Sequence, residues 1–405
     1  MSNYREINCC EVCGKENLEK VLDLGLHPMC DDLVEIKSNR ICDEYPINIL
    51  FCNQCNTAHQ KCQIPKRSLF PDSYHYRSRF TKDVLNGMQA LVSSCESKFP
   101  DFKNKKILDI GCNDGSLLNF FKEKNFLTFG IEPTGAYKEA KDKGHEVYND
   151  FLTVELANQI VTKHGNPDFI TFTNVFAHIE NLQEVIDSLK ILLGPKTILI
   201  IENHYLGAII EKNQFDTFYH EHPRTYSLKS FQFVAKKLNA HLIASELTNR
   251  YGGNIRVFIT QDAKLPREES FFNEDNLATE FYNMQGSINQ WIKRKKKFIN
   301  DFVDKNGKIR AKAFPGRAAI LIKLLELSDK HISAVYEKDG SMKIGHYLPG
   351  TRIPILSDSD LFGLDDQSKP ILNLAWHISD EIKQYLRKNM YEGEVLDIIS
   401  DNDFV

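Results

Sequence analysis

Several features are missing from this 405-residue sequence, and each absence excludes a class of protein. No run of about 18 apolar residues occurs, which excludes a transmembrane helix of ordinary length. The first residues also lack the apolar segment of a signal peptide. Basic and acidic residues number 51 and 55, so the net charge of −4 favours neither nucleic acid nor a membrane as a partner. We therefore expect a soluble cytoplasmic protein.

Cysteine is absent from most of the chain, because all ten cysteines lie in the first 112 residues. Four of them form two C-x-x-C turns, Cys10 with Cys13 and Cys52 with Cys55. Two such turns supply a tetrahedral shell of four thiolates, which suits Zn²⁺ better than free or redox-active thiols. Cys9 is an alternative to Cys10 but lacks the two-residue spacing to Cys13. The sequence predicts a structural zinc site, with an inserted loop between the two turns.

Strand and helix patterns alternate after the cysteine-rich region, which itself looks irregular. Alternation of this kind predicts a mostly parallel α/β sheet with its functional groups at the carboxyl ends of the strands. A long helix over 276–303 precedes a second α/β set. We therefore expect three domains, namely a zinc-binding domain (1–80), a Rossmann-like domain (81–304) and a second Rossmann-like domain (305–405).

A glycine-rich turn follows the first expected strand of the middle domain, in "ILDIGCNDGSLL" (107–118). Asp109, Gly111, Asn113 and Gly115 lie in or beside this turn, where a ligand can approach the backbone closely. Glu132 ends the next strand, where an acidic residue can accept both ribose hydroxyls of an adenosine. The spacing differs from the dinucleotide motif G-x-G-x-x-G. It resembles class I S-adenosylmethionine (AdoMet) methyltransferases, so AdoMet is the expected ligand, with a simple strand–helix turn as the alternative.

Further polar residues follow later strands of the same domain. "TNVFAHI" (173–179) contains Asn174 and His178 at the place where such enzymes put groups that face AdoMet or substrate. His178 is also compatible with a histidine that only packs in the core. The segment "IENHY" (201–205) ends the next strand on the same side.

The segment "FDTFYHEHPRTYS" (215–227) combines histidines, acids, hydroxyls and aromatic rings. A histidine is suited to remove a proton because its pKa lies near the operating pH. Glu221 could orient a histidine or hold a substrate amine, and Tyr219 could donate to an oxyanion. The close spacing of His220, Glu221 and His222 disfavours a metal site, because these side chains cannot readily converge on one ion. A surface loop is the other alternative.

The ordered motifs together resemble the sugar C-methyltransferases of deoxysugar biosynthesis, over nearly the whole chain. The matching motifs are "CEVCG", "DLGLHP", "YHYRS", "LDIGCNDGSLL", "GIEP", "NVFAHI", "FDTFYHEH", "GGNIRV", "KIGHYLPGTRIPI" and "LAWHISDEI". The resemblance implies that Tyr219, Glu221, His222 and Tyr76 line the catalytic site. One departure lies in the C-terminal domain, where Pro315, Gly316 and Arg317 replace a Gly-Tyr-Gly-Ala-type turn with a lysine.

The resemblance also implies a reaction, namely methylation at C-3 of a nucleotide-linked 4-keto-6-deoxysugar. In that reaction His222 removes the C-3 hydrogen, the enolate carbon attacks the AdoMet methyl group, and Tyr219 or Tyr76 stabilises the charge on the C-4 oxygen. We expect dTDP as the nucleotide, with GDP or another nucleotide open, and a monomeric protein. The alternatives are an O- or N-methyltransferase, a zinc-containing RNA methyltransferase, which this acidic chain disfavours, and a non-catalytic AdoMet-binding module.

Overall fold

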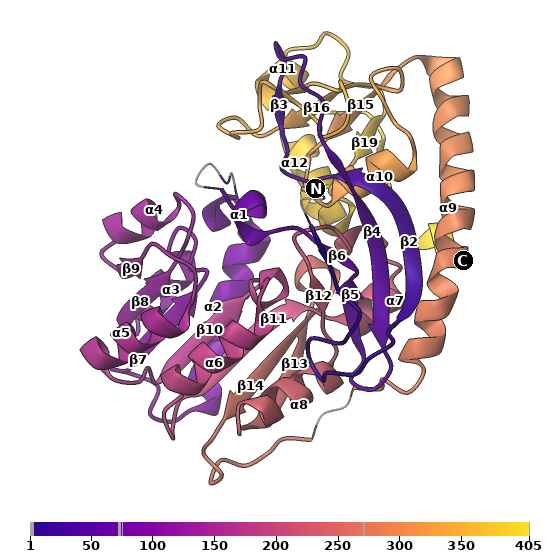
Figure 1. Cartoon of the computed structure of the whole chain (residues 1–405). Coiled ribbons are helices and arrows are strands. Elements are labelled where there is room, and N and C mark those ends of the chain that lie inside the picture. The colour runs from indigo at the N-terminus through magenta and orange to yellow at the C-terminus, as the bar shows by residue number, and fades with distance from the viewer. Residues whose placement is uncertain (1–3, 72–73, 75, 270–271, 405) are drawn as a thin grey trace. The chain divides into compact units, whose positions relative to one another are not determined.

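The computed structural model describes residues 4–71, 74, 76–269 and 272–404, which form two compact units (Figure 1). Each unit is built from three stretches of chain, so the units do not follow one another in sequence. Unit 1 contains Met1–Glu19, Leu50–Ile209 and Glu221–Ala278, and unit 2 contains Lys20–Ile49, Ile210–His220 and Thr279–Val405. The predicted domain boundaries near 80 and 304 remain predictions. Among the described residues, no helix is long and apolar enough to cross a membrane.

Unit 1 is organised around a seven-stranded sheet in the order β13-β14-β11-β10-β7-β8-β9. The neighbours from β11 to β9 are parallel, whereas β14 runs antiparallel to both β11 and β13. This arrangement confirms the predicted class I methyltransferase fold. The strands are β7 (Lys106–Ile110), β8 (Leu127–Ile131), β9 (Glu146–Tyr148), β10 (Phe169–Thr173), β11 (Ile198–His204), β13 (His241–Thr248) and β14 (Asn254–Thr260).

Helices cover both faces of this sheet, because alternate residues of each central strand face opposite sides. Ile107 packs with apolar residues of α2 and α3, whereas Leu108 and Ile110 pack with those of α5, α6 and α8. The helices of unit 1 are α1 (Lys66–Leu69), α2 (Lys82–Lys98), α3 (Ser116–Lys122), α4 (Tyr137–Asp142), α5 (Val154–His164), α6 (Leu182–Leu192) and α8 (Leu228–Lys237), and α7 (Leu206–Glu211) crosses into unit 2. Short 3-10 turns are η1 (Ser78–Phe80), η2 (Phe176–His178) and η4 (Arg250–Gly252).

Unit 2 contains the second α/β sheet that the sequence predicts. Its five strands are all parallel, in the order β18-β16-β15-β19-β20. Figure 1 shows the long helix α9 (Leu277–Asn306) beside β2 (Glu19–Pro28), where the Gln285 side chain accepts a hydrogen bond of 2.8 Å from the Asp23 backbone. The other elements are β15 (Ile309–Lys312), β16 (Ile332–Glu337), β17 (His346–Tyr347), β18 (Ile355–Ser357), β19 (Ile371–Asn373), β20 (Val395–Asp397), α10 (Ala318–Leu324), α11 (Asp358–Phe362), α12 (Ser379–Lys388), η3 (Phe215–Thr217), η5 (Trp376–Ile378) and η6 (Asp401–Phe404).

The region between the two C-x-x-C turns corrects one expectation. We expected an irregular first domain with an inserted loop, but this region contains two of the longer strands, β2 (Glu19–Pro28) and β4 (Glu44–Cys52). Gly25, with a φ of 84°, interrupts the apolar alternation of β2, and Pro46 lies within β4. Glycine and proline are both unusual inside strands, so the sequence of these two segments did not indicate strands. Shorter strands here are β1 (Arg5–Glu6), β3 (Val34–Glu35), β5 (Thr57–Gln60) and β6 (Cys62–Gln63), and β12 (Arg224–Thr225) pairs with β5.

Candidate functional site

The glycine-rich turn leaves the carboxyl end of β7 and requires glycine at both predicted positions. Gly111 and Gly115 have φ values of 73° and 75°, in the left-handed region that favours glycine. A Cβ atom on Gly111 would lie 2.5 Å from Val175 Cγ2, and one on Gly115 would lie 3.0 Å from Ala140 Cβ. The turn is therefore both left-handed and tightly packed, which suits a backbone that a ligand approaches closely.

Glu132 lies at the carboxyl end of β8, next to this turn, and its side chain is only 4% exposed. One carboxylate oxygen accepts a hydrogen bond of 2.9 Å from the backbone N–H of Asn113. The other accepts from the backbone N–H of Thr134 at 2.9 Å and from its hydroxyl at 2.6 Å. Burial raises the pKa of Glu132 despite these donors. Glu132 therefore holds the glycine-rich turn, and the oxygen that accepts from Asn113 retains capacity to accept from a ligand hydroxyl.

Asp109 lies within β7, and its buried carboxylate accepts a hydrogen bond of 2.7 Å from the Thr171 hydroxyl in β10. Burial raises the pKa of Asp109 to about 7 from an ordinary value of 3.8. The side chain is thus directed to the neighbouring strand, and its predicted contact with the cofactor remains a prediction.

The raised pKa of Asp109 predicts a pH dependence of stability. The folded chain holds this proton where the unfolded chain has lost it, so stability should fall as pH rises from about 4 to about 7. An Asp109→Asn variant has no such proton and can still accept from Thr171. At pH 8 it should be more stable than the native chain by a few kcal/mol, at about 1.4 kcal/mol per pKa unit. The gain should shrink towards pH 5, as measured by urea unfolding, whereas Asp150→Asn at an exposed position should give no such trend.

Asn113 connects the glycine-rich turn to the segment that carries Tyr76. Its side-chain amide donates to the Tyr76 carbonyl at 3.2 Å, and its side-chain oxygen accepts from the Ser78 backbone at 3.0 Å. Arg77 donates to the carbonyls of Tyr74 and Tyr76, each at 2.8 Å. The Tyr76 backbone is therefore held beside the turn that we expect to bind AdoMet.

Three histidines from separate elements of unit 1 lie together at the carboxyl edge of the sheet. The ring centroid of His222 lies 4.8 Å from that of His178 and 5.4 Å from that of His204. His178 donates through Nδ1 to the Glu221 carbonyl at 2.7 Å, and burial lowers the pKa of His178 to about 4. A neutral His178 with its proton on Nδ1 leaves Nε2 as an acceptor.

Tyrosine hydroxyls complete this histidine cluster. Tyr74 donates to the Glu221 carboxylate at 3.2 Å, and the hydroxyls of Tyr76 and Tyr251 lie 3.0 Å apart. The ring of Tyr251 lies 5.3 Å from that of His204. The cluster thus combines groups that can accept a proton with groups that can donate to an oxyanion.

The structure brings together four of the predicted residues in unit 1, namely Tyr76, His178, Glu221 and His222. Tyr219 lies in unit 2, together with His220, which donates to the Tyr45 carbonyl at 3.1 Å. Sequence reasoning did not single out His204, Tyr74 or Tyr251 as site residues. The position of His204 in "IENHY" at a strand end was a usable signal, and Tyr74 lies in the "YHYRS" motif.

Asn174 follows β10 with a φ of 55°. Its backbone N–H donates to the Glu202 carbonyl at 2.7 Å, and its side-chain oxygen accepts from Asn254 at 3.0 Å. The side-chain nitrogen is buried and has no hydrogen-bond partner within the described part of the chain. A donor left in this state is suited to a bound ligand.

Arg317, in the altered turn of the C-terminal domain, is neutralised within unit 2. It donates to the two Asp216 oxygens at 2.9 and 2.6 Å, and its guanidinium carbon lies 5.3 Å from the centroid of the Trp376 ring. Trp376 also donates to Asp216 at 2.9 Å. The basic group is therefore committed to an internal ion pair in this structure.

The four predicted metal ligands form one compact group in unit 1, with all their sulfur atoms within 4.8 Å of one another. Cys10 lies 3.5 Å from Cys55, and Cys13 lies 3.5 Å from Cys52, measured between Sγ atoms. A tetrahedral zinc site requires sulfur–sulfur separations of about 3.8 Å, from zinc–sulfur bonds of about 2.3 Å. The Sγ cluster has the ligand number and dimensions that suit zinc, and Cys9 lies outside it.

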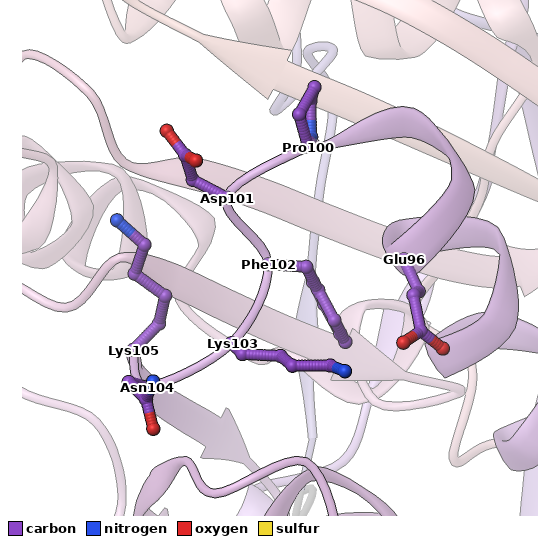
Figure 2. Close-up of a pocket in the computed structure, with 7 residues that line it drawn as sticks. All are labelled: Glu96, Pro100, Asp101, Phe102, Lys103, Asn104 and Lys105. Atoms are coloured by element: carbon purple, nitrogen blue, oxygen red, sulfur yellow. The ribbon is translucent and has the colours of Figure 1, made fainter.

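A surface pocket of about 440 Å³ occupies the opposite edge of the sheet. Figure 2 shows its lining, which comes from the end of α2 and the loop that leads into β7. This loop precedes the first residue of β7, so the pocket lies away from the carboxyl ends where the histidines gather. We assign it no role.

Comparison with protein families divides the chain into three matched regions. Residues 10–70 match a putative zinc binding domain, residues 80–245 a methyltransferase domain, and residues 249–396 a C-methyltransferase C-terminal domain. A curated relative, C-methyltransferase NovU from Streptomyces niveus, is 25% identical over 390 residues, which cover 93% of this chain and 92% of the relative. The chain is an AdoMet-dependent C-methyltransferase.

Solved structures match parts of this C-methyltransferase. The PH0226 protein of Pyrococcus horikoshii is 14% identical, covering 48% of this chain and 97% of its own length, with a TM-score of 0.37. Magnesium protoporphyrin IX methyltransferase of Synechocystis, with bound SAH, is 14% identical, covering 44% and 84%, with a TM-score of 0.34.

Proposed function

We propose that this C-methyltransferase methylates a carbon next to a ketone in a nucleotide-linked sugar, at C-3 of a 4-keto-6-deoxysugar. The observation that carries the proposal is the cluster of His222, His178 and His204 with tyrosine hydroxyls, on the same sheet edge as the glycine-rich turn. A carbon acid needs both a base and a group that stabilises an enolate, and this cluster contains both kinds of group.

The proposed reaction has two steps. His222 takes the proton from C-3, and the electron pair of that C–H bond moves into an enolate whose negative charge lies mainly on the C-4 oxygen. The enolate carbon then forms a bond to the AdoMet methyl group as the carbon–sulfur bond breaks, which leaves neutral S-adenosylhomocysteine. Tyr76 is proposed to donate a hydrogen bond to the C-4 oxygen, with Tyr219 as a second donor. Alignment of the two reactants contributes much of the rate in such a transfer.

His178 and Glu221 are proposed to keep His222 in its working form. A neutral His178, fixed by its bond to the Glu221 carbonyl, places no competing positive charge beside His222. Glu221 is held by Tyr74 and can accept a hydrogen bond from the protonated base or from a substrate group. The sugar, its substituent at C-3 and its nucleotide remain open, with dTDP proposed and GDP as an alternative.

A change at Glu132 tests the cofactor half of the proposal. Glu132→Gln keeps the size of the side chain but replaces one acceptor oxygen by an amide donor facing the ribose and the turn. Affinity for AdoMet, measured by calorimetry, should weaken about 10- to 100-fold, because hydrogen bonds to a charged group contribute about 1.5–3 kcal/mol. Glu146→Gln, in β9 of the same sheet, should bind AdoMet normally. Unchanged affinity in Glu132→Gln would place the cofactor elsewhere.

The substrate half is tested by incubating the protein with AdoMet and a panel of nucleotide-linked 4-keto sugars, with dTDP and GDP members. Mass spectrometry should find one added methyl group, and NMR should find it on C-3 with the C-3 hydrogen lost. A methylated product that retains this hydrogen would favour an O- or N-methyltransferase. A panel of nucleotide sugars without the ketone provides the control, since these should not react.

A further inference from the structure

Tyr251 has a backbone conformation that is costly for its residue type. Its φ of 52° and ψ of 25° place it in the left-handed region, which an aromatic residue adopts at a cost on the order of 1–3 kcal/mol. The two glycines that follow have φ values of 87° and 139°. A Cβ atom on Gly253 would lie 2.5 Å from Ala208 Cβ, so the turn is also closely packed. The surrounding structure therefore holds Tyr251 in this conformation.

A buried ion pair fixes the residue immediately before Tyr251. Arg250 donates to Glu202 at 3.1 Å, and both side chains are almost fully buried. Glu202 also accepts from Arg256 at 2.8 Å and lies two residues before His204 on β11. On helix α2, a Cβ atom on Gly87 would lie 2.5 Å from Arg250 Cδ, so this helix leaves room for the arginine. The turn is thereby tied to the strand that supplies His204.

The Tyr251 side chain reaches from this fixed turn to the predicted catalytic tyrosine. Its hydroxyl lies 3.0 Å from the Tyr76 hydroxyl, and burial raises the pKa of Tyr76 well above its ordinary value, so the Tyr76 hydroxyl keeps its proton and can donate it to a ligand. The Tyr76 carbonyl is held separately by Asn113 and Arg77. When two hydroxyls form one hydrogen bond, one of them donates its proton to the other. The accepting hydroxyl keeps its own proton, which it can donate to a third group.

We propose that Tyr251 is a positioning residue for Tyr76, donating to the Tyr76 oxygen so that the Tyr76 proton points to the oxyanion of the substrate. This inference rests on the proposed function, in which Tyr76 stabilises the enolate. Tyr251 acts only through Tyr76, and its contribution appears in the transition state. The strained turn of residues 250–253 holds the Tyr251 hydroxyl in place.

The test is a cycle of Tyr76→Phe, Tyr251→Phe and the double variant, with steady-state kinetics on the sugar that the native protein methylates. Tyr251→Phe should lower kcat about ten-fold, the effect of one ordinary hydrogen bond, while KM changes less than about two-fold. In the Tyr76→Phe background the same change should have no further effect, because the partner is absent. Tyr148→Phe, which removes another hydrogen-bonded hydroxyl of unit 1, is the matched control and should keep full activity.

If the decreases in kcat of the two single variants multiply in the double variant, the proposal is overturned. A merely structural effect of Tyr251 would not depend on Tyr76 and would give this result. A second measurement needs no substrate. The change Tyr76→Phe alters the ultraviolet titration of the protein, and the same change in the Tyr251→Phe background shows how much of that alteration depends on Tyr251. Different alterations in the two backgrounds are expected for a coupled pair, and equal alterations would refute the pairing. If no sugar of the panel reacts, the proposed function fails while this titration still decides on the pair.

Discussion

Replacing His222 by alanine should reduce methyl transfer by about 10²–10⁴-fold while binding of AdoMet and of the sugar nucleotide persists. A positioned general base contributes this range of rate, and it acts on the transition state more than on the bound ground state. His222 is 4% exposed, and its ring lies near those of His178 and His204. Initial rates and calorimetric affinities of the same purified variant separate the loss of the base from a loss of binding.

The proposed role of His222 as the base can be tested without methyl transfer. In D₂O, with S-adenosylhomocysteine in place of AdoMet, the native protein should exchange the C-3 hydrogen of a 4-keto sugar for deuterium, and His222→Ala should not. His220→Ala is the matched control, because the His220 ring donates to the Tyr45 carbonyl and is not one of the three clustered histidines. Its folded fraction should keep both exchange and methylation. Full activity in His222→Ala would instead move the base to Glu221, His178 or His204.

A Cys52→Ser/Cys55→Ser double variant should lose its zinc and unfold at a temperature lower by at least about 10 °C. Structural zinc sites contribute to folding directly, with binding free energies of about 10–16 kcal/mol in small domains. Cys10, Cys52 and Cys55 are also part of the apolar core of unit 1, which includes residues of α5, α6 and α8. Loss of the metal therefore leaves hydroxyls and unpaired thiols within a packed core.

Metal analysis and thermal unfolding of the same samples measure both effects. The native protein should contain about one equivalent of zinc, as a closed shell of four sulfurs implies. Cys9→Ser changes the neighbouring thiol outside the cluster and should keep the metal and the unfolding temperature. Full zinc occupancy in the double variant would refute the assignment of the ligands.

The parts of the fold that local sequence determines were the parts that could be predicted. Strands β7, β8, β10 and β11 are rich in apolar residues, which made the alternation of strands and helices visible, and the helix predicted over 276–303 is α9 (Leu277–Asn306). The two C-x-x-C turns could also be recognised, because four cysteine thiolates at that spacing indicate a metal site. The glycines of the turn after β7 were recognisable because left-handed backbone excludes most other residues.

Other features depend on contacts between distant residues and left no local pattern. Strand β4 contains Pro46, which argues against a strand when read alone. Tyr251 contributes to the site through a hydrogen bond to Tyr76 across 175 positions of chain. The composition of the two units was equally hidden, because unit 2 collects three separate stretches of sequence and only tertiary contacts reveal their association.

The four zinc ligands stand on either side of the first excursion of the chain into unit 2. Cys10 and Cys13 precede Lys20, where the chain leaves unit 1, and Cys52 and Cys55 follow Leu50, where it returns. A metal bound to all four acts as a cross-link that closes this excursion into a ring. In the chain-entropy model, a cross-link around about 40 residues removes about 4 kcal/mol of conformational freedom from the unfolded chain. The zinc thus offsets part of the conformational entropy that is lost on folding when this segment of chain joins unit 2. A metal that takes no part in the reaction would in this way stabilise the path of the chain.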